Sequence, residues 1–200
     1  MAAALLQLAG VHYRVGGREL WTGVDAEITP GVTWVGGDEG VGKTTLLRLL
    51  AGVCRPSQGE LLVPRGVAPR VAWTDPQDDQ MTVRDALALG LQVHAGGDPT
   101  ALAALVEALD LWPHLDKALY MLSTGSRRKV GLAVTLASGA DLLLLDQPFM
   151  ALDHPSERVV LAWLAEVAGE GRRAALVADY LPPPGVGLSG QIDLDRYRAT

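Results

Sequence analysis

Residues 37–44, Gly-Asp-Glu-Gly-Val-Gly-Lys-Thr, have the types and the spacing of a phosphate-binding loop, the P-loop. Its glycines allow a tight turn whose N–H groups point inward and form a nest for phosphate oxygens. Lys43 would reach the β- and γ-phosphates of a nucleotide, and the Thr44 hydroxyl would bind Mg²⁺. The alternative is a glycine-rich turn with an incidental lysine. The flanks favour the phosphate site, because 32–35 predicts a buried strand and 44–50 predicts a helix.

Composition and charge exclude several classes of protein. The chain has 200 residues, 48% hydrophobic and 20% charged, which suits one domain with room for a small insertion. The net charge of −6 argues against a surface built for nucleic acid. A single cysteine, Cys54, excludes an intramolecular disulfide. The first residues lack a basic secretion signal and no apolar run approaches a membrane span, so we expect a cytoplasmic protein that meets a membrane only through partner chains.

Strand and helix patterns alternate along the chain. The apolar patterns predict strands at 5–8, 19–28, 60–63, 70–73, 141–146, 174–178 and 191–194, and helices at 127–137 and 155–169. Residues 85–119 have helical periodicity, broken at 96–100, and show no strand pattern. We therefore expect an α/β fold of one domain, 1–200, with a core of about 1–80 and 138–200 and an inserted helical subdomain of about 81–137. Thr82 begins that subdomain as an N-cap, with Asp85 three residues on.

Further segments follow the P-loop in a fixed order, and together they resemble the ATP-binding cassette (ABC) ATPases. Residues 122–130, Leu-Ser-Thr-Gly-Ser-Arg-Arg-Lys-Val, resemble the family's signature, which is usually LSGGQ followed by basic residues. Residues 142–146 resemble the Walker B strand and 151–153 the D-loop, with lesser landmarks at 56–60 and 82–85. The resemblance runs from about Leu6 to Tyr180. It implies a P-loop NTPase core, with a mostly parallel sheet flanked by helices and an antiparallel N-terminal part.

The resemblance also implies that ATP and Mg²⁺ bind between two cassettes arranged head to tail. The phosphates would be held by Gly37, Asp38, Glu39, Gly40, Val41, Gly42, Lys43, Thr44 and Thr45. Tyr13, otherwise an aromatic at a sheet edge, would stack on adenine. Ser123, Gly125 and Ser126 of the signature would contact the ATP of the other subunit. The metal would be held by Thr44, by Asp146 through water, and by Gln77, for which Asp75 is the alternative because this loop is short.

Two positions depart from the family's pattern for an efficient ATPase. Gln147 follows Walker B where the family has the glutamate that polarises the attacking water, and an amide cannot accept a proton. A positioned general base is worth about 10²–10⁴ in rate. Asp179 or Tyr180 stands where the family has its switch histidine, and a carboxylate there would repel the γ-phosphate. His154 could supply an imidazole nearby, but a histidine that faces solvent is the favoured interpretation.

We therefore expect an ABC-type ATPase subunit with weak hydrolysis. It would pair with a second cassette, as a homodimer or heterodimer, and dock on transmembrane permease subunits at the inner face of the cell membrane. Its length resembles the small cassettes of bacterial exporters, such as the haem-exporter ATPase of cytochrome c maturation. Gln147 is either an engineered change or natural, and the altered Asp179 favours the natural origin, because one substitution would not explain both.

Three other functions stay open. A regulatory or structural cassette would bind ATP without turnover. A soluble ABC protein of DNA repair or translation would carry long coiled-coil insertions or tandem cassettes, which this sequence lacks. A P-loop kinase or GTPase would have no role for the signature at 122–126, and ranks last.

Overall fold

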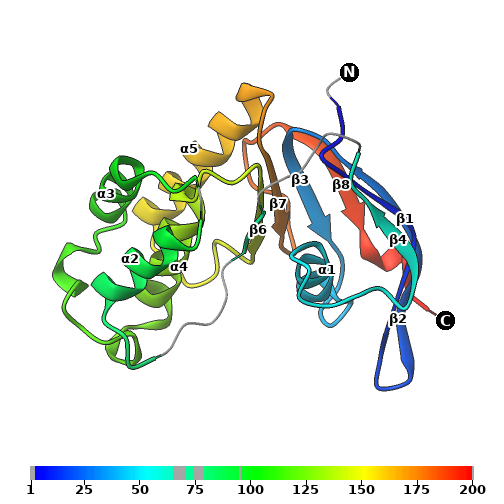
Figure 1. Ribbon diagram of the computed structural model, residues 1–200, viewed down its shortest axis with the longest axis horizontal. Coiled ribbons are helices and arrows are strands. Elements are labelled where there is room, and N and C mark those ends of the chain that lie inside the picture. Colours follow the sequence, from blue (N-terminus) through cyan, green and yellow to red (C-terminus); the bar gives the residue numbers. More distant parts are fainter. Residues whose placement is uncertain (1–2, 65–70, 74–78, 95, 200) are drawn as a thin grey trace.

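The computed structural model describes residues 3–64, 71–73, 79–94 and 96–199, with only the backbone of 71–73. The parallel sheet has the strand order β5 (Val71–Trp73), β6 (Leu142–Asp146), β7 (Ala174–Ala178), β3 (Gly31–Gly36) and β8 (Leu188–Asp193). The antiparallel sheet has the order β2 (Arg18–Ile28), β1 (Leu6–Val15) and β4 (Gln58–Leu62). These two sheets confirm the predicted fold class, with a parallel core and an antiparallel N-terminal part (Figure 1).

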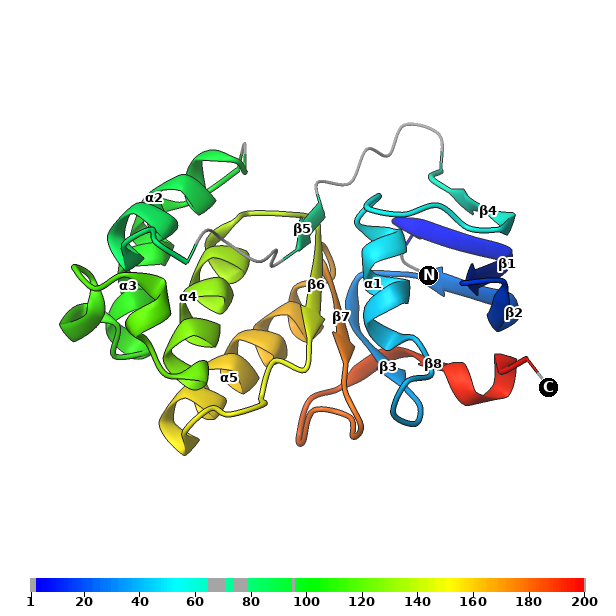
Figure 2. The ribbon, with the colours of Figure 1, turned by 90° about the horizontal axis from the view of Figure 1, so that it is seen from below.

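The helices are divided between the two faces of the parallel sheet. They are α1 (Lys43–Leu50), α2 (Val83–Gln92), α3 (Pro99–Ala108), α4 (Thr124–Ala137) and α5 (His154–Glu170), with the short 3₁₀ helices η1 (Trp112–His114), η2 (Leu119–Met121) and η3 (Leu194–Tyr197). Helix α1 lies between the parallel and antiparallel sheets, and α2 to α5 lie on the other side of the parallel sheet (Figures 1 and 2). None of the helices in the described ranges is long and apolar enough to cross a membrane.

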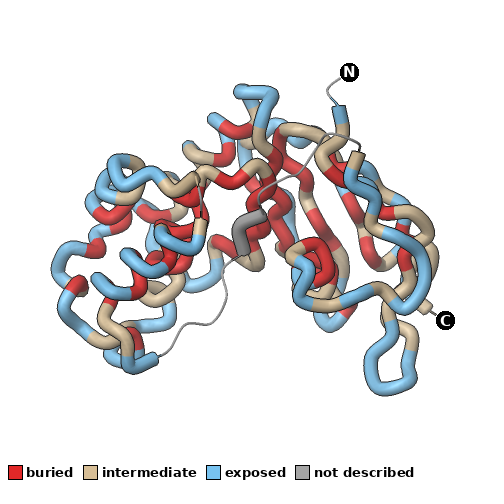
Figure 3. The backbone as a smooth tube through the Cα atoms, viewed as in Figure 1, coloured by how far each residue is buried: buried red, intermediate tan, exposed pale blue. Residues whose placement is uncertain are grey.

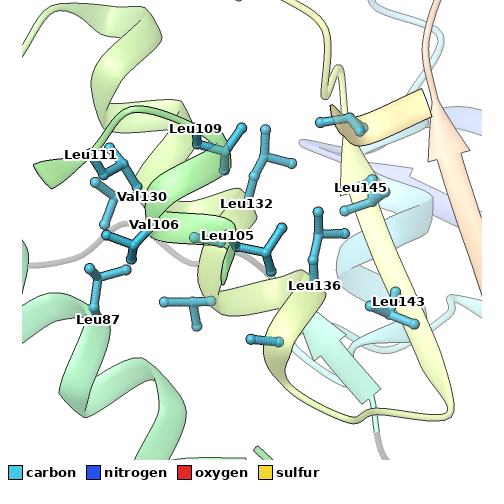
Figure 4. Packing of buried hydrophobic residues seen from close by; sticks show 14 of the residues in the cluster. Leu87, Leu105, Val106, Leu109, Leu111, Val130, Leu132, Leu136, Leu143 and Leu145 are labelled. Atoms are coloured by element: carbon cyan, nitrogen blue, oxygen red, sulfur yellow. The ribbon is translucent and has the colours of Figure 1, made fainter. Parts of the chain in front are cut away.

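Strand β6 divides the hydrophobic core, because its side chains alternate between two faces. Leu142 and Leu144 join the cluster that contains α1 and the antiparallel sheet, whereas Leu143 and Leu145 join the cluster of α4 and its neighbours. Figure 4 shows Leu143 and Leu145 pointing toward Leu136 and Leu132 of α4. All four leucines are at most 2% exposed. A strand buried on both faces reads as an unbroken apolar run, which is typical of parallel sheets (Figure 3).

The structure corrects the bounds of several predicted elements. The first strand does not end at residue 8 but continues to Val15, and the alternating pattern is interrupted by an irregular register between Leu8 and Val11. Gly10 lies there with φ 55°, the left-handed conformation that glycine adopts in one class of β-bulge. The last strand is β8, longer than the predicted 191–194. The predicted turn at 122–126 is partly helical, because Ser123 caps α4 and Thr124 begins it.

The predicted N-cap at Thr82 is present at the start of α2. The Thr82 hydroxyl accepts a hydrogen bond from the Asp85 backbone N–H at 3.1 Å. The Asp85 carboxylate accepts from that same hydroxyl at 2.6 Å, so it does not reach back to the Thr82 backbone as a glutamate would. Half of a capping box is therefore formed, by the Thr82 hydroxyl, and the Asp85 side chain does not supply the other half.

The close packing of α2 on α4 at Gly90 leads to a testable prediction. We expect Gly90→Ala to destabilise the fold, because the added Cβ would lie 2.5 Å from Val134 Cγ1, and a β-branched side chain gives little. Overpacking costs about 1–3 kcal/mol and outweighs the about 0.5–1 kcal/mol that alanine otherwise gains in a helix. Gly169→Ala in α5 is the control, because nothing lies within 4 Å of its added Cβ. Urea unfolding should show opposite shifts; equal shifts would contradict this packing.

Candidate functional site

The P-loop occupies the turn between β3 and α1, where the chain must reverse sharply. Gly42 is the N-cap of α1 and has φ 101°, a conformation that favours glycine. A Cβ at Gly42 would also lie 2.4 Å from Leu20 Cδ2 and 2.7 Å from Trp21 Nε1. Two side chains of β2 therefore press against the loop from outside. The sequence folds into this nest because only a glycine can both turn there and accept that contact.

Lys43 is buried and its ammonium group stays inside the loop. Its Nζ donates hydrogen bonds to the carbonyl oxygens of Gly37 at 2.6 Å and Asp38 at 2.9 Å. The same Nζ lies 4.3 Å from the centre of the Tyr180 ring, which is within cation–π range. The charge is thus held by dipoles and an aromatic face, with no carboxylate bonded to it in the described residues. It remains available to an anion.

Thr44 and Asp146 meet beneath the loop. The Thr44 hydroxyl donates to Asp146 Oδ2 at 2.7 Å, which joins the start of α1 to the end of β6. Hydroxyl and carboxylate oxygens are ligands that Mg²⁺ prefers, and Mg²⁺ keeps several waters and takes substrate phosphates as its other ligands. No cluster of three or more His, Cys, Asp or Glu that could hold a metal occurs in the described ranges. The donor set therefore fits a Mg²⁺ that arrives with a nucleotide.

Gln147 and Asp179 follow neighbouring strands and lie side by side. The Gln147 backbone N–H donates to the Ala178 carbonyl at 2.8 Å, and Gln147 has φ 46°, which is unusual for a residue with a side chain. Arg128 Nη1 donates to the carbonyls of Asp146 at 2.9 Å and of Gln147 at 2.7 Å. These bonds fix the turn after β6, so the strained backbone is held from α4 and from β7.

Asp179 lies at the carboxyl end of β7, close enough to the site to feel its charges. Burial raises the pKa of Asp179, and the negative charge of Asp146 raises this pKa further. The Tyr180 N–H, which donates to Asp179 Oδ1 at 2.8 Å, and the positive charges of Lys43 and Arg128 oppose that rise. The indole N–H of Trp34 donates to the Asp179 carbonyl at 3.0 Å and holds this backbone against β3.

The signature begins α4 and packs on its own D-loop. A Cβ at Gly125 would come within 2.3 Å of the Ala151 carbonyl oxygen, so this turn requires glycine for close approach. Lys129 pairs with Asp153 at 2.6 Å, and Asp153 also caps α5 by accepting from the Ser156 N–H at 2.9 Å. These contacts hold the pKa of Asp153 well below its usual range, with the Lys129 hydrogen bond as the largest cause.

The structure does not bring the signature of a chain to its own P-loop. Helix α1 packs on the face of β6 that carries Leu142 and Leu144, and α4 packs on the opposite face. Ser123, the N-cap of α4, is exposed, and Gly125 and Ser126 follow it in the first turn. Helix α4, at whose start these three residues lie, is therefore across the parallel sheet from α1 (Figure 1).

The remaining residues that the sequence analysis singled out lie on separate elements or outside the described residues. Tyr13 lies on β1 with its ring centre 5.4 Å from that of Trp21, and a hydrogen bond with the Cys54 side chain raises the Tyr13 pKa. Thr45 is half-buried in α1. His154 has a side chain that is 94% exposed and pairs with Glu157 at 3.0 Å, as the solvent-facing interpretation predicts. Gln77 and Asp75 lie outside the described residues.

The motifs gave no sign of several residues that touch the site. Asp195, in η3, accepts from the backbone N–H of Asp38 at 2.8 Å, and Arg198 lies 3.7 Å from the Asp38 carboxylate. The C-terminal segment thereby supports the P-loop from 157 positions away in sequence. Trp21 is fully buried, and its Nε1 has no hydrogen-bond partner within the described part of the chain. In the sequence, the signal for the Asp195 contact is limited to the presence of an acidic residue after the last predicted strand.

Comparison with known proteins agrees with this arrangement. Residues 22–150 match the profile of the ABC transporter family. The chain belongs to the ABC transporter family. A cytochrome c biogenesis ATP-binding export protein of Novosphingobium aromaticivorans is 34% identical to it over 174 residues, which cover 84% of this chain and 85% of that protein.

Longer proteins contain the same unit. An ABC transporter ATP-binding/permease protein of Mycobacterium tuberculosis is 31% identical over 196 residues, which are 88% of this chain but only 22% of that protein. A structure from Pyrococcus furiosus, assigned as an ABC transporter ATP-binding protein, superposes with a TM-score of 0.78 over 97% of this chain and 99% of that one. Its sequence identity is 22%, so this likeness concerns the fold.

The ion pair between α4 and the D-loop leads to a pH-dependent prediction. Because the pKa of Asp153 is lowered in the folded state, its contribution to stability is present above the unfolded value of about 3.9 and is lost as the pH falls below it. We expect Lys129→Met to lower the free energy of unfolding at pH 7 by about 1 kcal/mol, since Asp153 is half exposed and partly screened. The deficit should shrink in acid.

Urea unfolding at pH 7, 5 and 3 measures this difference. Arg84→Met is the control, because the Arg84–Asp116 pair has side chains that are 58% and 85% exposed and should contribute little at any pH. A Lys129→Met deficit that is constant across the pH range would show that the lysine acts through packing alone.

Proposed function

We propose that this chain is a nucleotide-binding subunit of an ABC transporter. The observation that carries the proposal is the 2.7 Å hydrogen bond from the Thr44 hydroxyl to the Asp146 carboxylate beneath the P-loop. Thr44 directly follows Lys43, which is buried. This combination suits a nucleotide that brings a divalent cation with it. The match to the ABC transporter family and the names of the relatives, which include ATP-binding proteins of export, support it.

The chain's own residues would act on bound ATP in distinct ways. Lys43 would turn its N–H bonds from the loop carbonyls to the phosphates, and the loop N–H groups would bind the remaining oxygens. Thr44 and Asp146 would hold Mg²⁺, which neutralises part of the phosphate charge when it is bound. Tyr13 would stack on the adenine. Gln147 could hold a water by hydrogen bonds but could not take its proton, so we expect slow hydrolysis.

The assembly follows from the separation of the two binding surfaces. Because a signature cannot reach the P-loop of its own chain, Ser123, Gly125 and Ser126 would complete the site of a second cassette arranged head to tail. Residues 81–137 would form the helical subdomain, with the rest as the core. Separate transmembrane permease subunits would bind the chain at the inner, cytoplasmic face of the membrane, whereas the Mycobacterium relative is named as an ATP-binding and permease protein in one longer chain.

A second candidate function is a cassette that binds ATP but does not turn it over. It is favoured by the two altered positions, which lie side by side and leave the site without the carboxylate after Walker B and without a histidine after β7. Binding energy alone could then switch the subunit between separate and dimeric states.

Phosphate release decides between the two functions. We expect Gln147→Glu to raise the rate of ATP hydrolysis by about 10²–10⁴, because it restores a general base on a backbone that the Arg128 and Ala178 contacts already hold. The measurement is phosphate release from Mg-ATP by the unaltered chain and the variant, with ATP binding measured in both.

Two further variants complete the comparison. Lys43→Ala should lose ATP binding and gives the background rate. Gln147→Glu combined with Asp179→His tests whether the carboxylate after β7 also limits the rate. If every variant except Lys43→Ala binds ATP and none releases phosphate, the non-hydrolysing function is correct. If the unaltered chain does not bind ATP, both proposed functions are wrong.

A further inference from the structure

The P-loop carries two carboxylates on the rim of a nest that is built for anions. Asp38 and Glu39 are exposed, and the Asp38 side chain is 77% exposed. Carboxylates beside a phosphate site oppose the binding of ATP, since like charges repel over distances of about 8 Å at physiological salt. A cation close to these two carboxylates would reduce that repulsion.

Within the described ranges, one of these two carboxylates, Asp38, has a cationic partner. Arg198 lies 3.7 Å from Asp38 Oδ2, and it also lies 3.8 Å from Asp195. Glu39 makes no hydrogen bond or ion pair with any residue that the structure describes. Lys43, the nearest basic residue in sequence, is buried and points at the loop carbonyls. Glu39 is thus an exposed acid on the rim of the P-loop, without a counter-ion among the residues that the structure describes.

The signature is basic, whereas the rim of the P-loop is acidic. Three basic residues follow Ser126, and the second and third are engaged within the chain, Arg128 with backbone carbonyls and Lys129 with Asp153. Arg127 is the first of the three, and its backbone N–H donates to the Ser123 carbonyl, so it lies one helical turn from the cap on the same face. Its side chain is 42% exposed and pairs with Asp79, whose side chain is 57% exposed.

The acid and the base cannot meet within one chain. The P-loop precedes α1 and the signature begins α4, and these helices pack on opposite faces of β6. A second copy, turned head to tail, would bring its signature to this P-loop and receive this signature at its own. The same pair would then form twice, as the symmetry of a dimer of identical chains requires.

We propose that this chain pairs with a second copy of itself, and that Glu39 of each P-loop forms an ion pair with Arg127 of the other copy's signature. This proposal rests on the head-to-tail dimer of the proposed function and names its partner. The loops that follow β6 and β7 also carry exposed apolar side chains that a partner could cover, with exposed fractions of 48% for Met150, 50% for Tyr180 and 76% for Leu181. A patch of apolar residues with charged pairs beside it is typical of protein interfaces.

A charge exchange between two variants tests the pairing. With saturating Mg-ATP, Glu39→Lys alone and Arg127→Glu alone should each weaken the dimer by about tenfold or more, because each brings like charges together at both sites. An equimolar mixture of the two variants should recover dimers. In a mixed dimer one site pairs lysine with glutamate, and the other keeps the original Glu39 and Arg127. Light scattering after size exclusion measures the dimer, and a fluorescent ATP analogue measures binding by each chain.

Matched controls separate this pairing from general charge effects. Glu107→Lys on α3 and Arg172→Glu after α5 make the same changes of charge at exposed positions away from both surfaces, and should leave dimerisation unchanged. Asp79→Asn removes the internal partner of Arg127 and should not weaken the dimer. If the mixture stays as monomeric as its parts, the pairing is wrong.

The remaining outcomes distinguish the pairing from the proposed function. A chain that binds ATP but stays monomeric at high concentration overturns the pairing of identical copies and leaves ATP binding intact, with a different cassette as the partner. A chain that binds no ATP overturns both the pairing and the proposed function.

Discussion

The arrangement of the site depends on one strand that is buried on both faces. Because the leucines of β6 alternate between two hydrophobic clusters, α1 and α4 must lie on opposite sides of it. Asp146 ends that strand and is reached from both sides, its carboxylate by the Thr44 hydroxyl and its carbonyl by Arg128. A polar residue inside the strand would have to be buried without water, at a cost of about 1–3 kcal/mol on mutational scales. The run of leucines is therefore also a condition for placing the Thr44 and Asp146 oxygens, which we propose as metal ligands.

The parts of the site that could be predicted from sequence are those encoded by local patterns. The P-loop and the strand that ends at Asp146 can each be recognised from a few consecutive residues. In a parallel sheet the carboxyl ends of the strands lie at the same edge, which brings the P-loop and Asp146 together. The support of Asp38 by Asp195 and Arg198 could not be predicted, because it joins distant segments that share no pattern. The length of β1 was missed for another reason: the bulge at Gly10 shifts the alternation by which a strand is recognised.

The backbone at Gln147 is held in an uncommon conformation. A residue with a side chain at φ 46° persists only where its surroundings determine it, and here the Ala178 carbonyl and Arg128 do so. Neither contact involves the side chain of Gln147, so the position would present an amide or a carboxylate in the same place. A site with an amide at this position could therefore lack a general base and still present the groups that we propose to bind phosphate and metal. Chemistry and binding are separable here because different atoms carry them.

The contacts of α4 tie the signature to the turn after β6 within each chain. Arg128 holds the carbonyls of Asp146 and Gln147, while Gly125 packs on the D-loop carbonyl of Ala151 and Lys129 binds Asp153. In a head-to-tail dimer, the signature of a chain would serve one nucleotide and its Asp146 would serve the other. A movement of α4 caused by the first nucleotide would then shift the backbone that supports the second. The contacts of Arg128, Gly125 and Lys129 that hold the turn after β6 would thus also couple the two sites. Closely packed elements move as rigid bodies and do not deform gradually.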